Sequence, residues 1–505
     1  MARLDGYVAN MEYVHNHCRE MSPSALNFVL VMQGMEPVRL DQGFSCCDLG
    51  CGQGLSSNIF ASCHPEGEFH GIDFNPAHIL GAREMARQAK LENVTFWEAS
   101  FDALAGLQLP RFDFITLHGV YSWVSADNRK LVVDFISRNL KVGGVVYLSY
   151  NSLPGWAALA PVRQLLVSLT DMSADLGEEQ INGAIDFVGR LRSMNLSYFN
   201  NNSSACTFFD ELCKRPQNYL AHEYFNEHWV QFYHADIVKD LAPAGVTFIG
   251  SATLGDNLDF LNFSRMEQQL LAEIDNPVVK ETVKDFSVNQ QFRRDVFIKG
   301  RNKLEQAAQQ ELFPGIRFAL VVPMESNSVR LDNPRGDMNL DPVLYKLVLS
   351  SFGKRDYSLE ELLRQPDIAL FRHEDVRQSL MHLLAAGYLL PAIAPSLQLI
   401  NSVKLFNYAV LERTAFDMEP KYLASPVVRS GIRLDWVPRL LLLGELTDVD
   451  DPLSFISGIM RVYNFALIKD GEVLKSWDKN IEELDLQIRA FQAFQLPLMK
   501  RLGVI

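Results

Sequence analysis

The residues best suited to chemistry lie in the segment CCDLGCGQG, in which Asp48 ends an apolar run. The glycines that follow it are Gly50, Gly52 and Gly54. Glycines at this spacing let a strand turn tightly into a helix while its backbone approaches a ligand. The dinucleotide fingerprint requires glycine where Leu55 stands, and no Lys-Ser or Lys-Thr pair follows as in a Walker loop. The loop alone therefore indicates either a different ligand site or a purely structural turn.

A second carboxylate, Asp73 in GIDFNP, ends the next apolar run, 23 residues after Gly50. At this position a carboxylate accepts hydrogen bonds from both hydroxyls of a ribose. Capping of the following helix is the alternative role, but Asn75 suits that role better. The glycine loop and Asp73 together predict a nucleoside ligand, and we include the adjacent Phe74 in this site.

A third apolar run ends in EASFD, at the place expected for the adenine base. Its residues are Glu98, Ser100, Phe101 and Asp102. Phe101 is equally suited to walling an adenine and to filling the core, because an aromatic side chain buries a large apolar area in either place.

The elements that position these residues predict an α/β fold with a mainly parallel sheet. Apolar runs at 44–50, 67–74, 93–100, 112–119 and 143–150 alternate with helical stretches. Further strands are expected at 246–252 and 292–300. We assign residues 41–151 and 232–300 to this sheet domain. Residues 152–231 are expected to form a helical insertion.

Other units are predicted on both sides of the sheet domain. Residues 1–40 are expected to form an N-terminal helical cap, 300–318 a connector, and 315–505 a mostly helical C-terminal domain. Three helical stretches and a short strand within 341–394 indicate a winged-helix-like module. Residues 341–400 hold six Lys and Arg against seven Asp and Glu, which favours a protein partner over DNA.

The pattern D-x-G-x-G-x-G from Asp48 to Gly54 resembles the class I S-adenosylmethionine-dependent methyltransferases. The resemblance covers about 40–150 and 232–300, and it implies a doubly wound Rossmann-like sheet with S-adenosyl-L-methionine as cofactor. It implies that Asp48 holds the amino group of the cofactor and Asp73 the ribose. The other cofactor-binding residues implied are Gly50, Gly52 and Gly54 in the loop, Phe74, Ser100 and Phe101 near the adenine, and His118.

A narrower resemblance is carried by LHGVYSWVS (117–125), SYNSLPGW (149–156) and YLAHEYFNEHWVQFYHADI (219–237). These segments are similar to a bacterial branch with a methyltransferase regulatory region, which includes rickettsial-type protein lysine methyltransferases acting on outer-membrane proteins. The segment from Tyr7 to Pro23 is shorter than in lysine-modifying members. The resemblance therefore defines the cofactor more closely than the methyl acceptor.

Methyl transfer from a sulfonium requires an aligned acceptor, exclusion of water and, for an amine, a neutral nucleophile. The candidate catalytic residues follow the fourth and fifth predicted strands and are His118, Tyr121, Trp123 and Asn151. The aromatic pair suits the wall of an acceptor channel, the histidine a proton relay and the amide a contact with an incoming amine. The alternatives are core packing for the aromatics, a structural hydrogen bond for the histidine and a turn role for the asparagine.

The segment HEYFNEH begins like a zinc-protease helix, but Asn226 stands where that motif requires its second histidine. We therefore expect no metal. The candidate ligands His222, Glu223, His228 and His234 are expected to form a polar network between the insertion and the cleft instead.

Composition narrows the class of protein further. The 505 residues carry 47 Lys and Arg against 61 Asp and Glu, a net charge of −14, which argues against nucleic acid as the main partner. The seven cysteines form no C-x-x-C pair, and the apolar stretches are shorter than the ~20 residues of a membrane span. These features predict a cytoplasmic protein without membrane insertion.

The leading hypothesis is an S-adenosylmethionine-dependent methyltransferase acting on a protein lysine. One alternative keeps the chemistry and makes the acceptor a small molecule. Another is a regulatory scaffold that binds the cofactor without chemistry and contacts a protein through its C-terminal domain.

Overall fold

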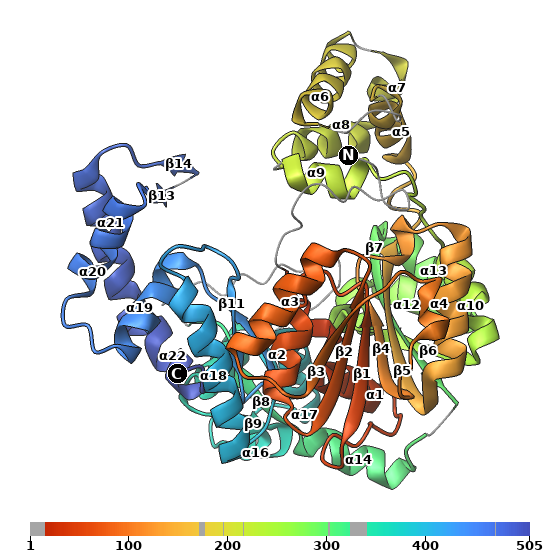
Figure 1. Ribbon diagram of the computed structural model, residues 1–505. Coiled ribbons are helices and arrows are strands. Elements are labelled where there is room, and N and C mark those ends of the chain that lie inside the picture. The colour runs from red at the N-terminus through yellow and green to blue at the C-terminus, as the bar shows by residue number, and fades with distance from the viewer. Residues whose placement is uncertain are drawn as a thin grey trace.

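The computed structural model describes residues 16–170, 177–194, 196–215, 217–300, 303–323, 341–469 and 471–505. The described part contains a seven-stranded sheet with the order β3-β2-β1-β4-β5-β7-β6 (Figure 1). Its strands are β1 (Phe44–Leu49), β2 (Gly67–Asp73), β3 (Val94–Glu98), β4 (Phe112–Leu117), β5 (Leu140–Asn151), β6 (Val246–Ser251) and β7 (Phe292–Lys299). The strand β7 runs antiparallel to the other strands of this sheet. The predicted strands and the Rossmann-like α/β fold class are confirmed.

Helices cover both faces of the sheet because alternate side chains along each strand point to opposite faces. In β5, Val145 and Tyr147 enter one core cluster, and Val146 and Leu148 enter another. The first cluster includes residues of α1 (Pro23–Met32), α2 (Leu55–Cys63) and α3 (Pro76–Gln88), and the second includes residues of α4 (Ala126–Asn139) and α10 (His234–Leu241). This arrangement leaves the carboxyl ends of the parallel strands free to carry a site.

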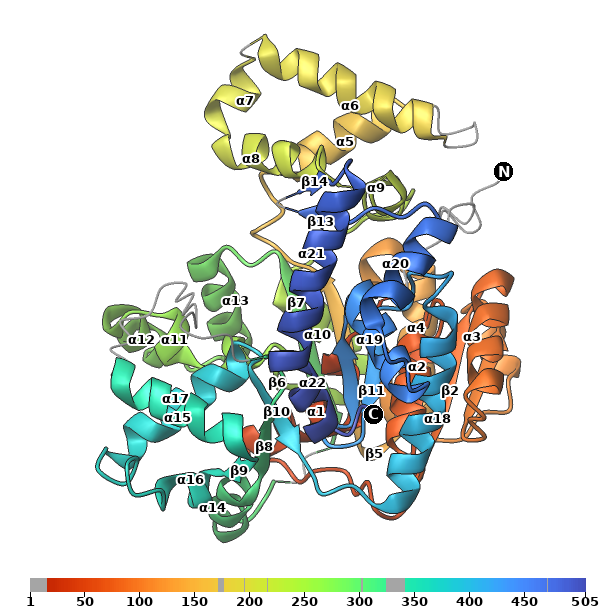
Figure 2. The same cartoon turned by 90° about the vertical axis from the view of Figure 1, so that its left-hand side faces the viewer.

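The stretch between β5 and α10 is helical in its described part, as predicted. Its helices are α5 (Ala160–Ser168), α6 (Glu178–Ser193), α7 (Ser197–Asn201), α8 (Ser203–Leu212) and α9 (Gln217–Tyr224). Ile181, Val188, Phe209 and Phe225 belong to a core cluster separate from the sheet. These helices stand above the carboxyl ends of the strands in both views (Figures 1 and 2).

The chain after β6 holds more secondary structure than the sequence indicated. Helices α11 (Asp259–Asn262), α12 (Arg265–Ala272) and α13 (Pro277–Val288) precede β7. The predicted connector at 300–318 instead contains α14 (Gln306–Gly315) and the first residues of β8 (Arg317–Leu320). The strand β8 was missed because its partners, β9 (Tyr357–Ser358) and β10 (Leu389–Ala392), lie far away in the sequence.

The three helices expected between 341 and 387 are present as α15 (Pro342–Lys354), α16 (Leu359–Leu363) and α17 (His373–Ala385). Ser358 caps α16 as predicted, because its hydroxyl accepts from the Glu361 N–H while the Glu361 carboxylate accepts from the Ser358 N–H. The expected strand at 388–394 is β10. The winged-helix interpretation of these elements stays a prediction, as do the domain boundaries.

Further elements complete the C-terminal part, and some of them pack against α2 of the sheet domain. They are α18 (Leu397–Arg413), β11 (Tyr422–Ser425), β12 (Ser430–Arg433), α19 (Trp436–Leu446), α20 (Pro452–Val462), β13 (Ile468–Lys469), β14 (Glu472–Val473), α21 (Trp477–Ala490) and α22 (Leu496–Arg501). Helix α18 lies beside α2, and side chains from both belong to one core cluster (Figure 2). In the described ranges no helix is both long and apolar enough to cross a membrane.

Candidate active site

The glycine loop between β1 and α2 adjoins a larger cavity of about 870 Å³ and a smaller one of about 520 Å³. Gly50, Gly52 and His118 line both. Of the other predicted cofactor residues, the larger cavity is lined by Asp73, Phe74, Ser100 and Phe101, and the smaller by Asp48. The structure thus brings residues from the ends of β1, β2, β3 and β4 to one place.

The three loop glycines all have positive φ, but they differ in what surrounds them. A Cβ on Gly50 would lie 2.5 Å from Val120 Cγ2, and one on Gly54 would lie 2.5 Å from Ala82 Cβ. A Cβ on Gly52 would meet no protein atom within 4 Å, because Gly52 faces open cavity. Close packing thus explains Gly50 and Gly54, whereas the space at Gly52 fits the close approach of a ligand. Gly54 lines neither cavity.

Asp48 is buried at the end of β1 and faces the smaller cavity. Its carboxylate accepts hydrogen bonds from Ser57 Oγ at 3.2 Å and Thr116 Oγ1 at 3.0 Å. Burial raises the pKa of Asp48 to about 7 because desolvation disfavours the charged form. A cation entering this cavity would favour the ionised carboxylate, so the site is suited to an ammonium group.

Asp73, at the end of β2, ties the glycine loop to the following helix. Its Oδ2 accepts from the Gly52 N–H and its Oδ1 from the Asn75 N–H, both at 2.9 Å. Asn75 caps α3 by accepting from the Ala77 N–H, as predicted. Each carboxylate oxygen accepts more than one hydrogen bond, so Asp73 retains capacity for ribose hydroxyls.

The side of the larger cavity that is predicted to hold the adenine is formed after β3. Ser100 Oγ donates to the carboxylate of Asp102, and both Ser100 and Phe101 line the cavity. Phe101 also packs against the core cluster on the α4 face, so its position suits both of its predicted roles.

His118 follows β4 and stands where the two cavities adjoin. Its Nδ1 lies 2.9 Å from the Tyr147 hydroxyl. Burial, with a smaller contribution from Arg294, lowers the pKa of His118 to about 4. The ring is therefore neutral at neutral pH and adds no positive charge near a cationic cofactor.

The candidate catalytic residues lie in two different environments. Trp123 lines the larger cavity with His118. Tyr121 is fully buried, its hydroxyl donates to Asp240 Oδ2 at 3.2 Å, and its ring packs on Phe232. Tyr121 lines neither cavity, so its position favours the core-packing interpretation.

Asn151 ends β5 and is buried. Its backbone N–H donates to Ser122 Oγ at 2.9 Å, and its carbonyl accepts from the Phe232 N–H at 3.0 Å. Asn151 lines neither cavity. His118 and Trp123 therefore line the same cavity, whereas Tyr121 and Asn151 do not line it.

Several known proteins are similar to this chain. It is 35% identical over 502 residues to the uncharacterized protein sll1526 of Synechocystis sp., covering 99% of each chain. It is 26% identical over 253 residues to the uncharacterized protein RP789 of Rickettsia prowazekii, covering 49% of this chain and 44% of that one. The solved structure of PKMT2 from Rickettsia typhi in complex with AdoHcy has the same fold, with a TM-score of 0.68 and 19% identity over 95% of this chain and 97% of that one.

Family models match two parts of the chain. Residues 40–200 match a methyltransferase domain, and residues 216–299 match a predicted methyltransferase regulatory domain. The chain belongs to the class I S-adenosylmethionine-dependent methyltransferases with a regulatory domain. The expected family and enzyme class are thus confirmed.

Other residues line the two cavities but were not predicted from the sequence. His78 lines the larger cavity and its Nδ1 lies 3.3 Å from Asp73 Oδ1. The sequence offered one signal for His78, which is that it lies on the first turn of α3, three residues after the N-cap Asn75. Asn16, Cys18 and Met21 line the smaller cavity, and no local motif marks them.

The residues predicted to form one polar network around the insertion lie in separate places in this methyltransferase. His234 Nδ1 bonds to Asp295 Oδ2 at 2.9 Å, within the core between β7 and α10. The carbonyl of Glu223 lies 3.5 Å from Trp123 Nε1, and burial raises the pKa of the Glu223 carboxyl to about 7. The side chain of His222 lies outside the described part. Within that part, no group of three or more His, Cys, Asp or Glu side chains is arranged to hold a metal ion.

Proposed function

We propose that this methyltransferase transfers the methyl group of S-adenosylmethionine to the amine of a protein lysine. The observation that carries the proposal is the larger cavity, which runs from Asp73 and Ser100 to His118 and Trp123. The resemblance of residues 117–125 to rickettsial-type lysine methyltransferases supports the choice of acceptor.

The cofactor is assigned along the strand ends. Asp48 holds its ammonium group, Gly52 gives it room, and Asp73 accepts from its ribose. Phe74, Ser100 and Phe101 surround the adenine, and His118 stands beside the methionine part. When bound, the cofactor supplies a methyl group on a good leaving group, so the protein contributes alignment and exclusion of water.

The acceptor end is suited to a neutral amine. A free lysine has a pKa near ~10.4, and an apolar environment lowers it because desolvation disfavours the ammonium. Val120, Trp123 and Val124 line the cavity beside the neutral His118. Trp123 also offers a π face that attracts the cation before it loses its proton.

Incubation of the purified chain with methyl-labelled S-adenosylmethionine and a cell extract tests the acceptor class. We expect label in the protein fraction, on lysine after hydrolysis. Label confined to small molecules would replace the proposal with the small-molecule alternative. The Gly52→Ala variant, which closes space in the cofactor cavity, is the control and should add much less label than the wild type to the same fraction.

We also infer a cytoplasmic location and a protein partner for the C-terminal domain. All seven cysteines are free thiols, which supports a reducing compartment. Localisation by fractionation, and affinity capture with and without residues 341–505, test these two inferences.

A further inference from the structure

The N-terminal segment 16–22, here called the strap, closes one side of the smaller cavity. Asn16, Cys18 and Met21 line this cavity together with Asp48 and Gly52. The strap holds little regular structure beyond a 3-10 turn at Arg19–Met21. Its position must therefore be fixed by contacts with other elements.

His17 makes the central contact and is itself buried. The Gly431 N–H donates to His17 Nε2 at 3.1 Å, and Ser430 Oγ lies 3.1 Å from the same atom. Because Nε2 accepts from the backbone, the ring proton lies on Nδ1, which faces Ser56 Oγ at 3.4 Å. Burial lowers the pKa of His17 to about 3, so the ring stays neutral.

Ser56 joins this contact to the cofactor side. It lies on α2, directly after the glycine loop, and lines the smaller cavity. Its hydroxyl also accepts from the Cys18 N–H at 3.1 Å. The Cys18 thiol lies 3.4 Å from the Tyr147 hydroxyl, which bonds to His118. A continuous hydrogen-bonded path therefore leads from the C-terminal hairpin β11–β12 to both cavities.

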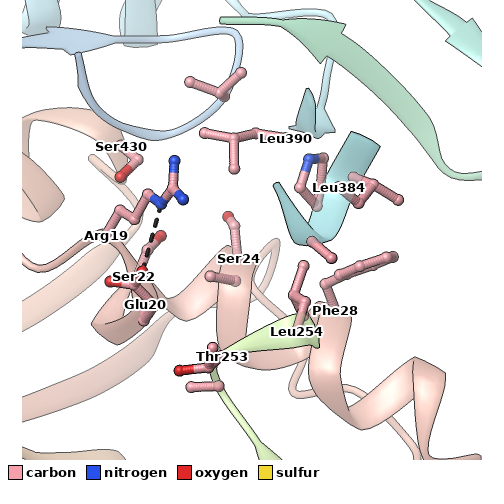
Figure 3. A pocket seen from close by; sticks show the side chains of 15 residues that line it. Arg19, Glu20, Ser22, Ser24, Phe28, Thr253, Leu254, Leu384, Leu390 and Ser430 are labelled. Carbon is pink, nitrogen blue, oxygen red and sulfur yellow. Dashed lines mark ion pairs between the residues drawn. The ribbon is translucent and has the colours of Figure 1, made fainter. Parts of the chain in front are cut away.

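The strap and the hairpin meet at further points. Ser22 Oγ donates to the Arg429 carbonyl at 3.1 Å. Figure 3 shows Arg19, Glu20 and Ser22 lining another cavity, with Ser430 beside Arg19. The strap thus has the cofactor cavity on one side and C-terminal residues on the other.

We propose that His17 is a positioning residue through which the C-terminal hairpin holds the strap over the methionine end of the cofactor. The C-terminal domain is then part of the cofactor site, although it contributes no side chain to either cavity at the glycine loop. The inference rests on the cofactor assignment proposed above.

The Gly431→Ala variant tests the proposal from the far end of the path. A Cβ at Gly431 would lie 2.7 Å from His17 Cδ2, so the ring must shift. The matched control is Gly458→Ala in α20, where a Cβ meets no atom within 4 Å. We expect Gly431→Ala to weaken S-adenosylmethionine binding about tenfold and to raise its KM with kcat nearly unchanged, since displaced walls misplace ligands. Gly458→Ala should bind like the wild type.

A double-variant comparison separates positioning from general destabilisation. In a His17→Ala background, Gly431→Ala should weaken binding no further, because both act through one contact. Additive losses, or equal affinity of Gly431→Ala and Gly458→Ala, would overturn the proposal.

Hydrogen exchange gives a readout that needs no cofactor. The Cys18 amide should exchange faster in Gly431→Ala than in Gly458→Ala. Absence of S-adenosylmethionine binding by the wild type would refute the cofactor assignment, whereas equal exchange in the two variants would refute the coupling of hairpin and strap.

Discussion

At Gly52, the need to leave space for a ligand can be distinguished from the need to pack closely against other residues. Its φ is +53° and its missing Cβ opens only onto cavity. Gly245 has a similar φ of +71°, also with no atom within 4 Å of a built Cβ, but it lies after α10, away from the loop. The two positions form a matched pair.

Gly52→Ala and Gly245→Ala should therefore each lose about 1–2 kcal/mol of stability, because alanine is strained at positive φ. Only Gly52→Ala should also lose cofactor affinity, by about tenfold or more, since its methyl group occupies ligand space. Thermal unfolding and calorimetric titration measure both effects. Equal affinities in the two variants would contradict the role of Gly52.

From the raised pKa of Asp48 we predict that cofactor binding depends on pH. With a pKa of about 7, its carboxyl is mostly protonated at pH 5.5, and only the ionised form attracts the ammonium group. S-adenosylmethionine affinity should rise about tenfold from pH 5.5 to 7, as follows from a single titrating carboxyl. Asp48→Asn should bind weakly with a flat profile in this range. A flat wild-type profile would exclude Asp48 as the partner of the amino group.

Substitutions of Trp123 and Tyr121 should have different effects, because we assign Trp123 to the acceptor channel and Tyr121 to the core. Trp123→Leu should lower kcat/KM for the acceptor about tenfold, because it removes a wall of the larger cavity. Tyr121→Phe should retain activity and lose about 1 kcal/mol of stability with its hydrogen bond to Asp240. Steady-state kinetics and thermal unfolding of the two variants check this, and a reversed pattern would place the acceptor beside Tyr121.

The residues predicted to bind the cofactor meet at the two cavities more completely than those predicted for the acceptor, for a geometrical reason. Asp48 and Asp73 follow apolar runs, and the ends of parallel strands meet at one edge of the sheet. Tyr121 and Trp123 lie two residues apart in a 3-10 turn, where successive side chains point about 120° apart. The sequence does not determine which of them faces the cavity.

At the scale of elements, β7 is joined to its neighbours by buried charges. Arg293 binds Asp295 at 2.9 Å and Glu281 at 2.9 Å and also pairs with Asp285. Asp295 further accepts from Tyr150 at 2.6 Å and bonds to His234. The network links β7 with β5, α10 and α13.

Arg293→Met should destabilise the sheet domain by about 3–5 kcal/mol, because it leaves buried carboxylates without their cation. Arg87→Met, which breaks an exposed pair with Glu84, is the control and should cost less than about 1 kcal/mol. Chemical denaturation followed by circular dichroism measures both. Similar losses of stability in the two variants would show that the buried network stabilises the protein no more than an exposed ion pair does.

The strands of the main sheet were predictable because their apolar runs are local signals. β8 pairs with β10 about 70 residues onward, so its four residues carry no local sign of their partner. The helices between β6 and β7 were missed for a different reason. Asn276 and Ser264 cap α13 and α12 in the expected way, but neighbouring antiparallel strands such as β6 and β7 require no helix between them.

At the scale of the whole molecule, the methyltransferase depends on contacts between distant parts of the chain. His17 meets Ser430, 413 residues away in sequence, and the strap that carries His17 closes the cavity around Asp48. Composition and local motifs carry no information about such a contact. The strands of the main sheet were therefore predictable from the sequence, whereas contacts between distant segments are seen only in the structure.

Calorimetric titration of the purified chain with S-adenosylmethionine measures whether the chain binds this cofactor. We expect saturable binding of one cofactor per chain, with competition by its demethylated product. Absence of binding by both compounds, in a folded chain, would contradict it.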